Sequence, residues 1–237
     1  MTPPVLRSIQ VALPQHFGTA KATDPMDRPW TSAVVKRAVA GPVRLGLFNL
    51  AGDEQADRVY HGGPNKAVMV YSAEHYDLWR RELALPDLPF GAFGENFTVE
   101  GLTEANVNLG DVWQVGQAVV QVAQPRQPCW KLARRWRIKT LALQLQETGR
   151  TGWYFRVLKE GVVAAGTTLE RLERPYPTWT IERMNRVMHF DKSDLRAAAE
   201  LAAIASLPAN WQTTLLKRVE QNVNPDPAKR LFGPNEP

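Results

Sequence analysis

Residues 112–130 read VWQVGQAVVQVAQPRQPCW, and this segment contains the features that decide the fold. Val112 to Val122 is mostly apolar and β-branched with Gly116 in its first half, which predicts a long strand with a turn or bulge at the glycine. Two X-Pro steps follow. They favour a stiff, extended backbone, because proline fixes its own φ and keeps the preceding residue out of the helical region. The segment therefore predicts a strand that leads into a rigid turn ending at Cys129.

Short strand patterns also fill the rest of the first two thirds of the chain. The clearest is a hairpin of residues 153–158 and 162–168, joined across Lys159, Glu160 and Gly161. Many short strands with few long helices are typical of a barrel, so we expect a mainly β fold with some α-helix, in which the β-barrel is closed. Other strands are expected over residues 8–13, 34–39, 43–50, 67–71 and 95–99, and helices over residues 73–83, 130–137 and 138–148.

The composition changes after residue 170. Arg171, Glu173, Arg174 and two prolines form a charged, stiff linker, and helical patterns follow it. We therefore divide the chain into a barrel domain, residues 1–172, and a C-terminal helical extension with its tail, residues 173–237. The extension's three helices are expected over residues 180–188, 192–205 and 208–220. Residues 222–237 are rich in proline and predict a frayed tail.

The composition excludes several classes of protein. One cysteine in 237 residues rules out a disulfide framework, and the four histidines lack the spacing of a protein-only zinc site. No apolar run reaches the length of a membrane span, and the first residues lack the apolar core of a signal peptide. We therefore expect a cytoplasmic protein without a membrane partner.

Cys129 is the first candidate for chemistry. If residues 130–137 form a short helix, the thiol lies near its N-terminus, with Arg126 and Lys131 close in sequence. Amide donors and cations both favour the thiolate, which is the reactive form of cysteine. A lone cysteine is more commonly a small buried hydrophobe, however, and the residues alone leave both alternatives open.

The net charge of +5 raises the question of an anionic partner. No acidic residue occurs between Val112 and Gln146, and this block fits a solvated face, a non-specific polyanion footprint or a pocket for a phosphorylated ligand. Its position around the Pro-Cys turn favours the pocket. The eight tryptophans are dispersed, which argues against a stacking platform, so no specific nucleic acid is expected. The basic residues of the block are Arg126, Lys131, Arg134, Arg135, Arg137 and Lys139.

Residues 57–68 form a second candidate segment. Gly62 and Gly63 would allow backbone amides to approach a ligand, and Lys66 supplies a positive charge that suits phosphate. The same Gly-Gly-Pro-Asn sequence is also an ordinary turn. His61, which precedes the glycines, is either a catalyst or a hydrogen-bonded structural histidine.

Residues 91–98 form a third candidate segment. Asn96 and Thr98 alternate with Phe97 along an expected strand, so they face the same side. Polar residues on the inner side of a barrel strand need partners. Either a polar cofactor or the neighbouring backbone supplies them.

A series of short motifs runs along the chain in a defined order: Trp30 to Lys36, Gly52-Asp53, His61-Gly62-Gly63, Lys66-Ala67-Val68, Tyr71, Glu74-His75-Tyr76, Gly94-Glu95-Asn96, Gln124-Pro125-Arg126, Pro128-Cys129 and Gly152-Trp153-Tyr154. Their order and spacing resemble those of the MOSC domain family, in particular its YiiM-like branch. The resemblance covers most of the chain, and the C-terminal helices resemble the small three-helix extension of that branch. One departure is Asn65, where the family usually has aspartate before the lysine.

The resemblance implies a β-barrel that holds a molybdenum cofactor, a molybdopterin-type group. Cys129 matches the cysteine that ligates molybdenum, and a soft thiolate suits a metal already chelated by a dithiolene. It also implies that Cys129, His61 and Asn96 are catalytic, with His61 donating or relaying a proton. The cofactor-binding residues would be Lys66 and Arg126 at the pterin side chain and its phosphate, Gly62 and Gly63 through their amides, and Asn96, Thr98 and Gln124 at polar edges.

The function that we expect from this resemblance is reduction of N-hydroxylated substrates, such as hydroxylaminopurine-type bases, to amines. The chain has no flavin or nucleotide fingerprint and no cysteine set for an iron–sulfur cluster, so electrons would come from a separate reductase. An exposed basic surface at Arg134, Arg135 and Arg137 would suit an acidic donor. Two alternatives stay open: a cofactor carrier or sulfur-transfer module that uses Cys129, and a nucleic-acid-binding domain.

Overall fold

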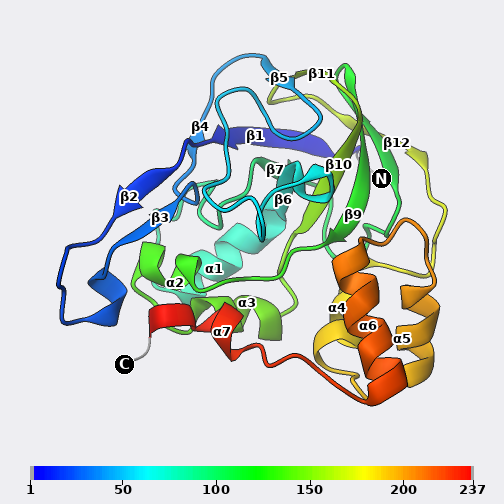
Figure 1. Cartoon of the computed structure of the whole chain (residues 1–237). Helices are drawn as coiled ribbons and strands as arrows, with labels where there is room; N and C mark the ends of the chain where they lie inside the picture. Colours follow the sequence, from blue (N-terminus) through cyan, green and yellow to red (C-terminus); the bar gives the residue numbers. More distant parts are fainter. Residues whose placement is uncertain (1–2, 236–237) are drawn as a thin grey trace.

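A computed structural model describes residues 3–235 of the chain, and an eight-stranded curled sheet forms its centre (Figure 1). The strands are β1 (Val5–Val11), β4 (Arg37–Ala38), β6 (Val68–Ser72), β7 (Phe97–Glu100), β8 (Val112–Val115), β9 (Ala118–Pro125), β10 (Trp153–Lys159) and β12 (Leu169–Glu173). Their order across the sheet is β12-β8-β9-β10-β6-β7-β1-β4. All neighbours are antiparallel except β6 and β7, which are parallel. A crossover through α1 (Tyr76–Glu82) connects that parallel pair.

The segment around Gly116 forms the hairpin of β8 and β9. Gly116 has φ +56°, and a Cβ at this position would lie 2.7 Å from the carbonyl oxygen of Val162, so the turn requires a glycine. The expected turn at this residue is confirmed. Because β9 continues to Pro125, the Cys129 turn begins directly at the end of a central strand.

Two small sheets lie beside the main one. One pairs β2 (Gln15–Phe17) with β3 (Trp30–Ser32), and the other pairs β5 (Val43–Leu45) with β11 (Gly161–Val163). The expected hairpin over residues 153–168 is therefore wrong, because β10 pairs with β9 and β6 and not with β11. At Gly161 the chain passes so close to the β8–β9 turn that a Cβ would lie 2.4 Å from the backbone of Gln117. This close passage directs β11 away from β10 and toward β5.

The main sheet curls without closing, so the prediction of a closed barrel is wrong. Closure needs a hydrogen-bond ladder between the first and the last strand of the sheet. Here the edge strands of the sheet are β12 and β4, and no ladder joins them within residues 3–235. Instead, β1 contacts the segment before β12 through the isolated bridge between Val5 and Thr168 and a few backbone hydrogen bonds, and the chain then turns to pair β12 with β8. The result is an open half-barrel within a mixed fold of sheet and helices.

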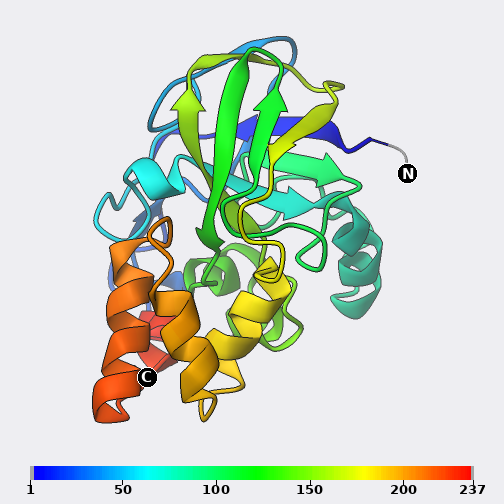
Figure 2. The ribbon, with the colours of Figure 1, turned by 90° about the vertical axis from the view of Figure 1, so that its right-hand side faces the viewer.

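Helices gather at the end of the half-barrel where β9 terminates, at the bottom of the rotated view (Figure 2). Two short helices follow the Cys129 turn, and three more follow residue 180, as expected for the extension. They are α2 (Lys131–Trp136), α3 (Leu141–Glu147), α4 (Ile181–His189), α5 (Leu195–Ala202) and α6 (Ala209–Gln221). None of the helices within residues 3–235 combines the length and the apolarity that a membrane span requires.

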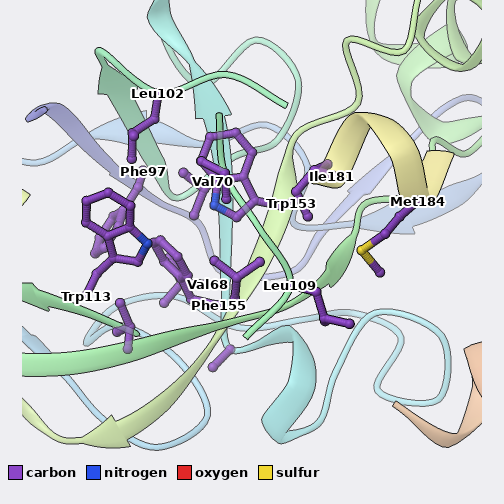
Figure 3. Packing of buried hydrophobic residues seen from close by; sticks show 14 of the residues in the cluster. Val68, Val70, Phe97, Leu102, Leu109, Trp113, Trp153, Phe155, Ile181 and Met184 are labelled. Atoms are coloured by element: carbon purple, nitrogen blue, oxygen red, sulfur yellow. The ribbon is translucent and has the colours of Figure 1, made fainter. Parts of the chain in front are cut away.

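One hydrophobic core joins the half-barrel to the extension. Trp153 of β10 packs in the same cluster as Ile181 and Met184 of α4 (Figure 3). All three side chains are fully buried, and burial of a large apolar side chain contributes about 1.5–3 kcal/mol. The extension therefore shares the core of the half-barrel. The domain division between residues 172 and 173 stays a prediction.

The proline-rich end of the chain is folded over residues 228–235, and the expectation of a frayed tail is wrong for this part. This segment contains α7 (Ala228–Leu231) and a short 3₁₀ helix at Gly233–Asn235. It does not fray because it docks on the protein: Gly233 lies against the ring of Trp130, and the side chain of Asn235 is buried. The last two residues of the expected tail, Glu236 and Pro237, lie outside the described residues.

Candidate functional site

An open cavity of about 680 Å³ lies at the end of β9. Residues from four segments line most of its wall: residues 32–36, 53–61, 93–96 and 126–131. The curl of the sheet brings these distant segments together. Of the predicted site residues, Cys129, His61, Lys66, Asn96 and Arg126 line the cavity, whereas Gly62, Gly63, Thr98 and Gln124 are not part of its lining.

Cys129 lies in this wall between the end of β9 and the start of α2. Its Sγ atom is 3.5 Å from Nε2 of His61, and the residue is half-buried. The carbonyl oxygen of Cys129 accepts a hydrogen bond from the amide of Leu132 (3.2 Å), which begins the helical turn. The expected position beside the start of a short helix is confirmed. The thiol therefore lines the cavity beside a histidine, which favours the chemical interpretation of Cys129 over that of a buried hydrophobe.

The surroundings of Cys129 favour its thiolate. Burial by itself raises the pKa of the thiol, but the hydrogen bond and the charge of His61, the charge of Arg126 and the amide of Lys131 together lower that pKa from 9.0 to about 6. A thiol with this pKa is mostly ionised at neutral pH. Cys129 and His61 therefore present a thiolate that can serve as a nucleophile or as a metal ligand.

We expect the alkylation rate of Cys129 in the folded protein to rise with pH around a midpoint near the pKa of about 6. Because folding lowers this pKa, the thiolate contributes stability above the unfolded pKa of 9.0, and the contribution is lost as the pH falls through about 6. His61→Asn removes the imidazole charge, so the midpoint should move upward. Iodoacetamide reports on this residue alone because the chain has one cysteine. A wild-type midpoint near 9 would contradict the lowered pKa of Cys129.

His61 is oriented by its own loop, residues 57–63. Nδ1 of His61 is 3.7 Å from Oδ2 of Asp57, and Oδ1 of Asp57 accepts hydrogen bonds from the amides of Val59 (3.1 Å) and Tyr60 (3.0 Å). Asp57 therefore holds the loop, and its carboxylate lies near Nδ1 of His61, which has no hydrogen-bond partner within residues 3–235. The sequence did not single out Asp57, although a carboxylate four positions before a candidate histidine is a usable signal.

The backbone conformation of this loop requires both of its glycines. A Cβ at Gly62 would lie 2.9 Å from the carbonyl oxygen of Arg58, and Gly63 adopts φ +92°, which side-chain-bearing residues rarely take. These constraints explain both glycines without a ligand. Contact of their amides with a cofactor stays a prediction.

Two cations face the same cavity. Nζ of Lys66 donates to the carbonyl oxygen of Tyr60 (2.6 Å), and burial lowers the pKa of this ammonium. Arg126 is 5% exposed, and its Nη2 donates to the carbonyl oxygen of Phe93 (3.2 Å). Its buried Nη1 has no hydrogen-bond partner within residues 3–235. Because a buried unpaired donor costs free energy, Arg126 fits a site that receives an anionic or acceptor-rich ligand.

Gln124 and Thr98 lie behind the cavity wall. Oε1 of Gln124 is buried and lacks a partner in the described part of the chain, so it remains free to accept a hydrogen bond. The hydroxyl of Thr98, in contrast, donates to Glu95 (3.1 Å) and accepts from Gln10 (3.2 Å). Contact of either residue with a cofactor stays a prediction, and the hydroxyl proton of Thr98 is already donated within the protein.

Asn96 lines the cavity but bonds to the protein. Its amide group donates to the carbonyl oxygen of Gln10 (3.2 Å) and to Oδ2 of Asp53 (2.9 Å), and its Oδ1 accepts from the amide of Met69 (3.1 Å). These contacts position Asp53, which is buried and pairs with the ammonium of Lys36. Asn96 is thus a positioning residue for Asp53, and its catalytic role stays a prediction.

Asp53 and Lys36 are cavity residues that our sequence analysis did not single out. Both lie within motifs that carry the family resemblance, but a separation of 17 residues gives no local sign of an ion pair. Burial lowers the pKa of Lys36, whereas the adjacent Asp53 raises it. The pair places a buried ammonium and a buried carboxylate in the cavity wall. Only the folded chain shows this pairing.

Three arginines of the basic block bond within the protein, and of these only Arg137 is exposed, so docking of an acidic electron donor on this block stays a prediction. Arg134 is 5% exposed and donates to backbone carbonyl oxygens of three residues. Arg135 donates to carbonyl oxygens of two residues, and Arg137 pairs with two aspartates. These side chains hold the loops around the cavity in place.

Comparison with known proteins identifies the family. The MOSC domain matches residues 57–170, and the YiiM-like, 3-alpha helix domain matches residues 179–222. Protein YiiM of Escherichia coli (strain K12) is 38% identical over 204 residues, which cover 85% of this chain and 91% of that protein. YflK of Bacillus subtilis (strain 168) is 46% identical over 190 residues, which cover 80% of this chain and 86% of that protein.

A longer relative and a solved structure extend the comparison. A Gibberella moniliformis (strain M3125 / FGSC 7600) protein named Reductase is 39% identical over 173 residues, which cover 72% of this chain but 31% of that protein. The crystal structure of YiiM from Geobacillus stearothermophilus superposes with a TM-score of 0.76 at 35% identity and covers 92% of this chain and 100% of that one. The half-barrel with its single cysteine turn, the three-helix extension and these similarities show that the chain belongs to the MOSC domain family, in its YiiM-like branch.

Proposed function

We propose that this protein is a molybdenum-cofactor-dependent reductase that converts N-hydroxylated compounds, such as hydroxylaminopurine-type bases, to amines. The observation that carries the proposal is one cavity wall where the Cys129 thiolate, His61 and an unpaired buried nitrogen of Arg126 meet. Membership of the MOSC family and the relative named Reductase support an oxidoreductase role.

The donor set of the cavity fits such a cofactor. Cys129 offers one soft thiolate, which suits a metal that brings its other ligands in a dithiolene. Nη1 of Arg126 and Oε1 of Gln124 are buried and unpaired within residues 3–235, so they offer a donor and an acceptor to a pterin, while Lys66 offers a charge to its phosphate. When bound, the cofactor supplies two-electron redox chemistry that amino-acid side chains lack.

The residues of the chain would bind and orient the substrate and would supply protons to it. Reduction of an N-hydroxyl group to an amine consumes two electrons and two protons and releases water. Nε2 of His61 lies 3.5 Å from Sγ of Cys129, so we assign the proton-holding role to this nitrogen. Lys36, buried beside Asp53, is a second ammonium donor at the cavity wall.

Electrons would come from a separate reductase, because the sequence has neither a nucleotide fingerprint nor a cysteine set for an iron–sulfur cluster. Arg134 and Arg135 of the basic block bond to backbone carbonyl oxygens within the protein, which leaves Arg137 as the exposed arginine that an acidic donor could contact.

The proposal is tested by a reduction assay on loaded protein. Supplied with low-potential electrons from an artificial donor, the holo-protein should convert an N-hydroxylated purine base to the amine, and the apo-protein should not. Elemental analysis for molybdenum and pterin fluorescence after oxidative release confirm the loading. If fully loaded protein reduces no hydroxylamine, amidoxime or N-oxide, the reductase proposal fails.

A cofactor carrier or sulfur-transfer module is the second candidate. It is favoured by the same thiolate, because a cysteine with a pKa of about 6 is also suited to attack the outer sulfur of a persulfide on a donor protein, so that Cys129 takes over that sulfur and the donor is released as a thiol. Release of bound cofactor to an acceptor enzyme, without turnover in the presence of an electron donor, would support this function over the first.

A further inference from the structure

The C-terminal tail, residues 222–235, leaves the extension and returns to the Cys129 turn. After α6 ends, Asn222 adopts a left-handed conformation (φ 53°), and the chain crosses to the side of the molecule where α2 and α3 lie. Figure 1 shows α7 beside these two helices, away from α4, α5 and α6. The tail therefore joins the end of the sequence to the residues that follow Cys129.

The tail bonds to both neighbours of Cys129. On one side, Nη1 of Arg230 donates to the carbonyl oxygen of Pro128 (2.5 Å). On the other side, the carbonyl oxygen of Arg230 accepts from the amide of Trp130 (2.9 Å), and the amide group of Asn235 donates to the carbonyl oxygen of Trp130 (3.2 Å). One short segment thus holds the backbone before and after the thiol.

Arg230 itself is fixed by a second contact. Its Nη2 donates to Oε1 of Gln146 on α3 (2.6 Å), so the two ends of the guanidinium connect α3 to the Cys129 turn. Burial lowers the pKa of Arg230 to about 10, while the charge of Cys129 raises it and that of Arg126 lowers it. The guanidinium therefore lies within electrostatic reach of the thiolate, and a bidentate planar cation holds such a geometry better than a flexible ammonium.

Gly233 brings the tail into direct contact with the residue after Cys129. A Cβ at Gly233 would lie 2.3 Å from Cδ1 of Trp130, and its φ of +54° also favours glycine. The guanidinium carbon of Arg134, on α2, lies 4.7 Å from the centre of the Trp130 ring. Nε of the same arginine donates to Oδ1 of Asn235 in the tail (2.7 Å). The indole next to the thiol is thus enclosed between α2 and the tail.

We propose that the C-terminal tail is a positioning element of the site, in which Arg230, Gly233 and Asn235 hold the Pro128–Trp130 turn so that Cys129 stays beside His61. The turn begins where β9 ends, and its first backbone bond, from the amide of Arg126 to the carbonyl oxygen of Gly152 (3.0 Å), fixes only its start. The tail fixes its other end. The catalytic meaning of this inference rests on the proposed function, whereas the positioning can be measured on protein without cofactor.

The test compares Arg230→Gln with Lys229→Gln in the full-length apo-protein. Both variants remove one positive charge from α7, but Lys229 is exposed and takes part in none of the contacts above. We expect Arg230→Gln to speed amide hydrogen exchange in residues 129–133 by about tenfold, with no change in β6, β10 or α4. Alkylation of Cys129 at about pH 10, above the unperturbed thiol pKa of 9.0, should also become several-fold faster because the turn opens. Lys229→Gln should match the wild type in both measurements.

Two milder variants keep the test conclusive if Arg230→Gln folds poorly. Arg230→Lys retains the charge and one of the two hydrogen bonds, so it should restore part of the protection. Gln146→Ala removes only the partner that orients the guanidinium, and it should give a smaller change in the same segment. Exchange that rises evenly throughout the protein, or Arg230 variants that equal Lys229→Gln, would overturn the proposal. A failed reductase assay would leave both measurements standing, so the two failures are distinguishable.

Discussion

Cys129→Ser is expected to abolish turnover while the protein keeps its fold. Serine has nearly the same volume as cysteine, but its hydroxyl stays neutral at pH 7 and is a hard donor, whereas the Cys129 thiol has a pKa of about 6 and supplies a soft thiolate. Loss of an outer-shell partner of a metal typically costs about 10–100-fold in affinity or activity, so loss of the ligand itself should cost more than about 100-fold. The reduction assay, with molybdenum content measured in parallel, checks this.

Two controls separate loss of chemistry from loss of structure. At about pH 5, below the Cys129 pKa of about 6, the thiolate no longer contributes to stability, so urea denaturation of apo Cys129→Ser should match the wild type within about 1 kcal/mol. Cys129→Ala, which removes the hydroxyl as well, should be equally inactive. Wild-type activity in Cys129→Ser would disprove the ligand assignment, and it would favour a proposal in which the thiol is only a packing residue.

Asp53→Ala should destabilise the protein by about 3–5 kcal/mol, the cost of leaving a buried partner charge uncompensated. Asp53 accepts hydrogen bonds from the amide of Ala12 (2.8 Å) and from Asn96 (2.9 Å), and it pairs with Lys36. The side chains of Asp53 and Lys36 are 1% and 7% exposed, so water compensates little for the lost carboxylate although both residues line the cavity. Urea denaturation should show a lower midpoint with an unchanged slope.

A combined variant and an exposed ion pair serve as controls for this result. Lys36→Met together with Asp53→Asn removes both charges, so it should recover at least half of the stability lost in Asp53→Ala. Glu100→Ala breaks the pair with Arg7, whose side chains are 55% and 53% exposed, and should change stability by less than about 1 kcal/mol. A loss below about 1 kcal/mol in Asp53→Ala would show that the pair contributes little to folding.

The local features of the site were predictable because they depend on a few adjacent residues. Prolines at 125 and 128 restrict the backbone ahead of Cys129, and the helix that follows begins at Lys131, as the residue pattern indicates. Gly116 marks a real turn, and helices follow residue 180. Family membership was also readable from the sequence, because it depends on the order of short motifs and not on their contacts.

The partners of those features were not predictable. The pattern of residues 153–168 indicated a hairpin, but β11 pairs with β5, and the chain passes close to the β8–β9 turn at Gly161. Arg134 looked like part of a basic surface, but it donates to the carbonyl oxygen of Pro25, 109 residues away (2.7 Å). The proline-rich tail looked unstructured, yet Arg230 bonds to Pro128 across 102 residues.

The sequence by itself determined the rigid turn that carries Cys129, the alternation of short strands with few helices, the three-helix extension and the family. Only the tertiary structure decided that the barrel stays open, that Asp53 pairs with Lys36 and that the tail returns to the thiol. The physical reason is the range of the interactions. Dihedral restrictions and apolar periodicity act within one turn or strand, whereas the partner of a strand edge or of a buried charge is selected by the packing of segments that meet only after the whole chain has folded.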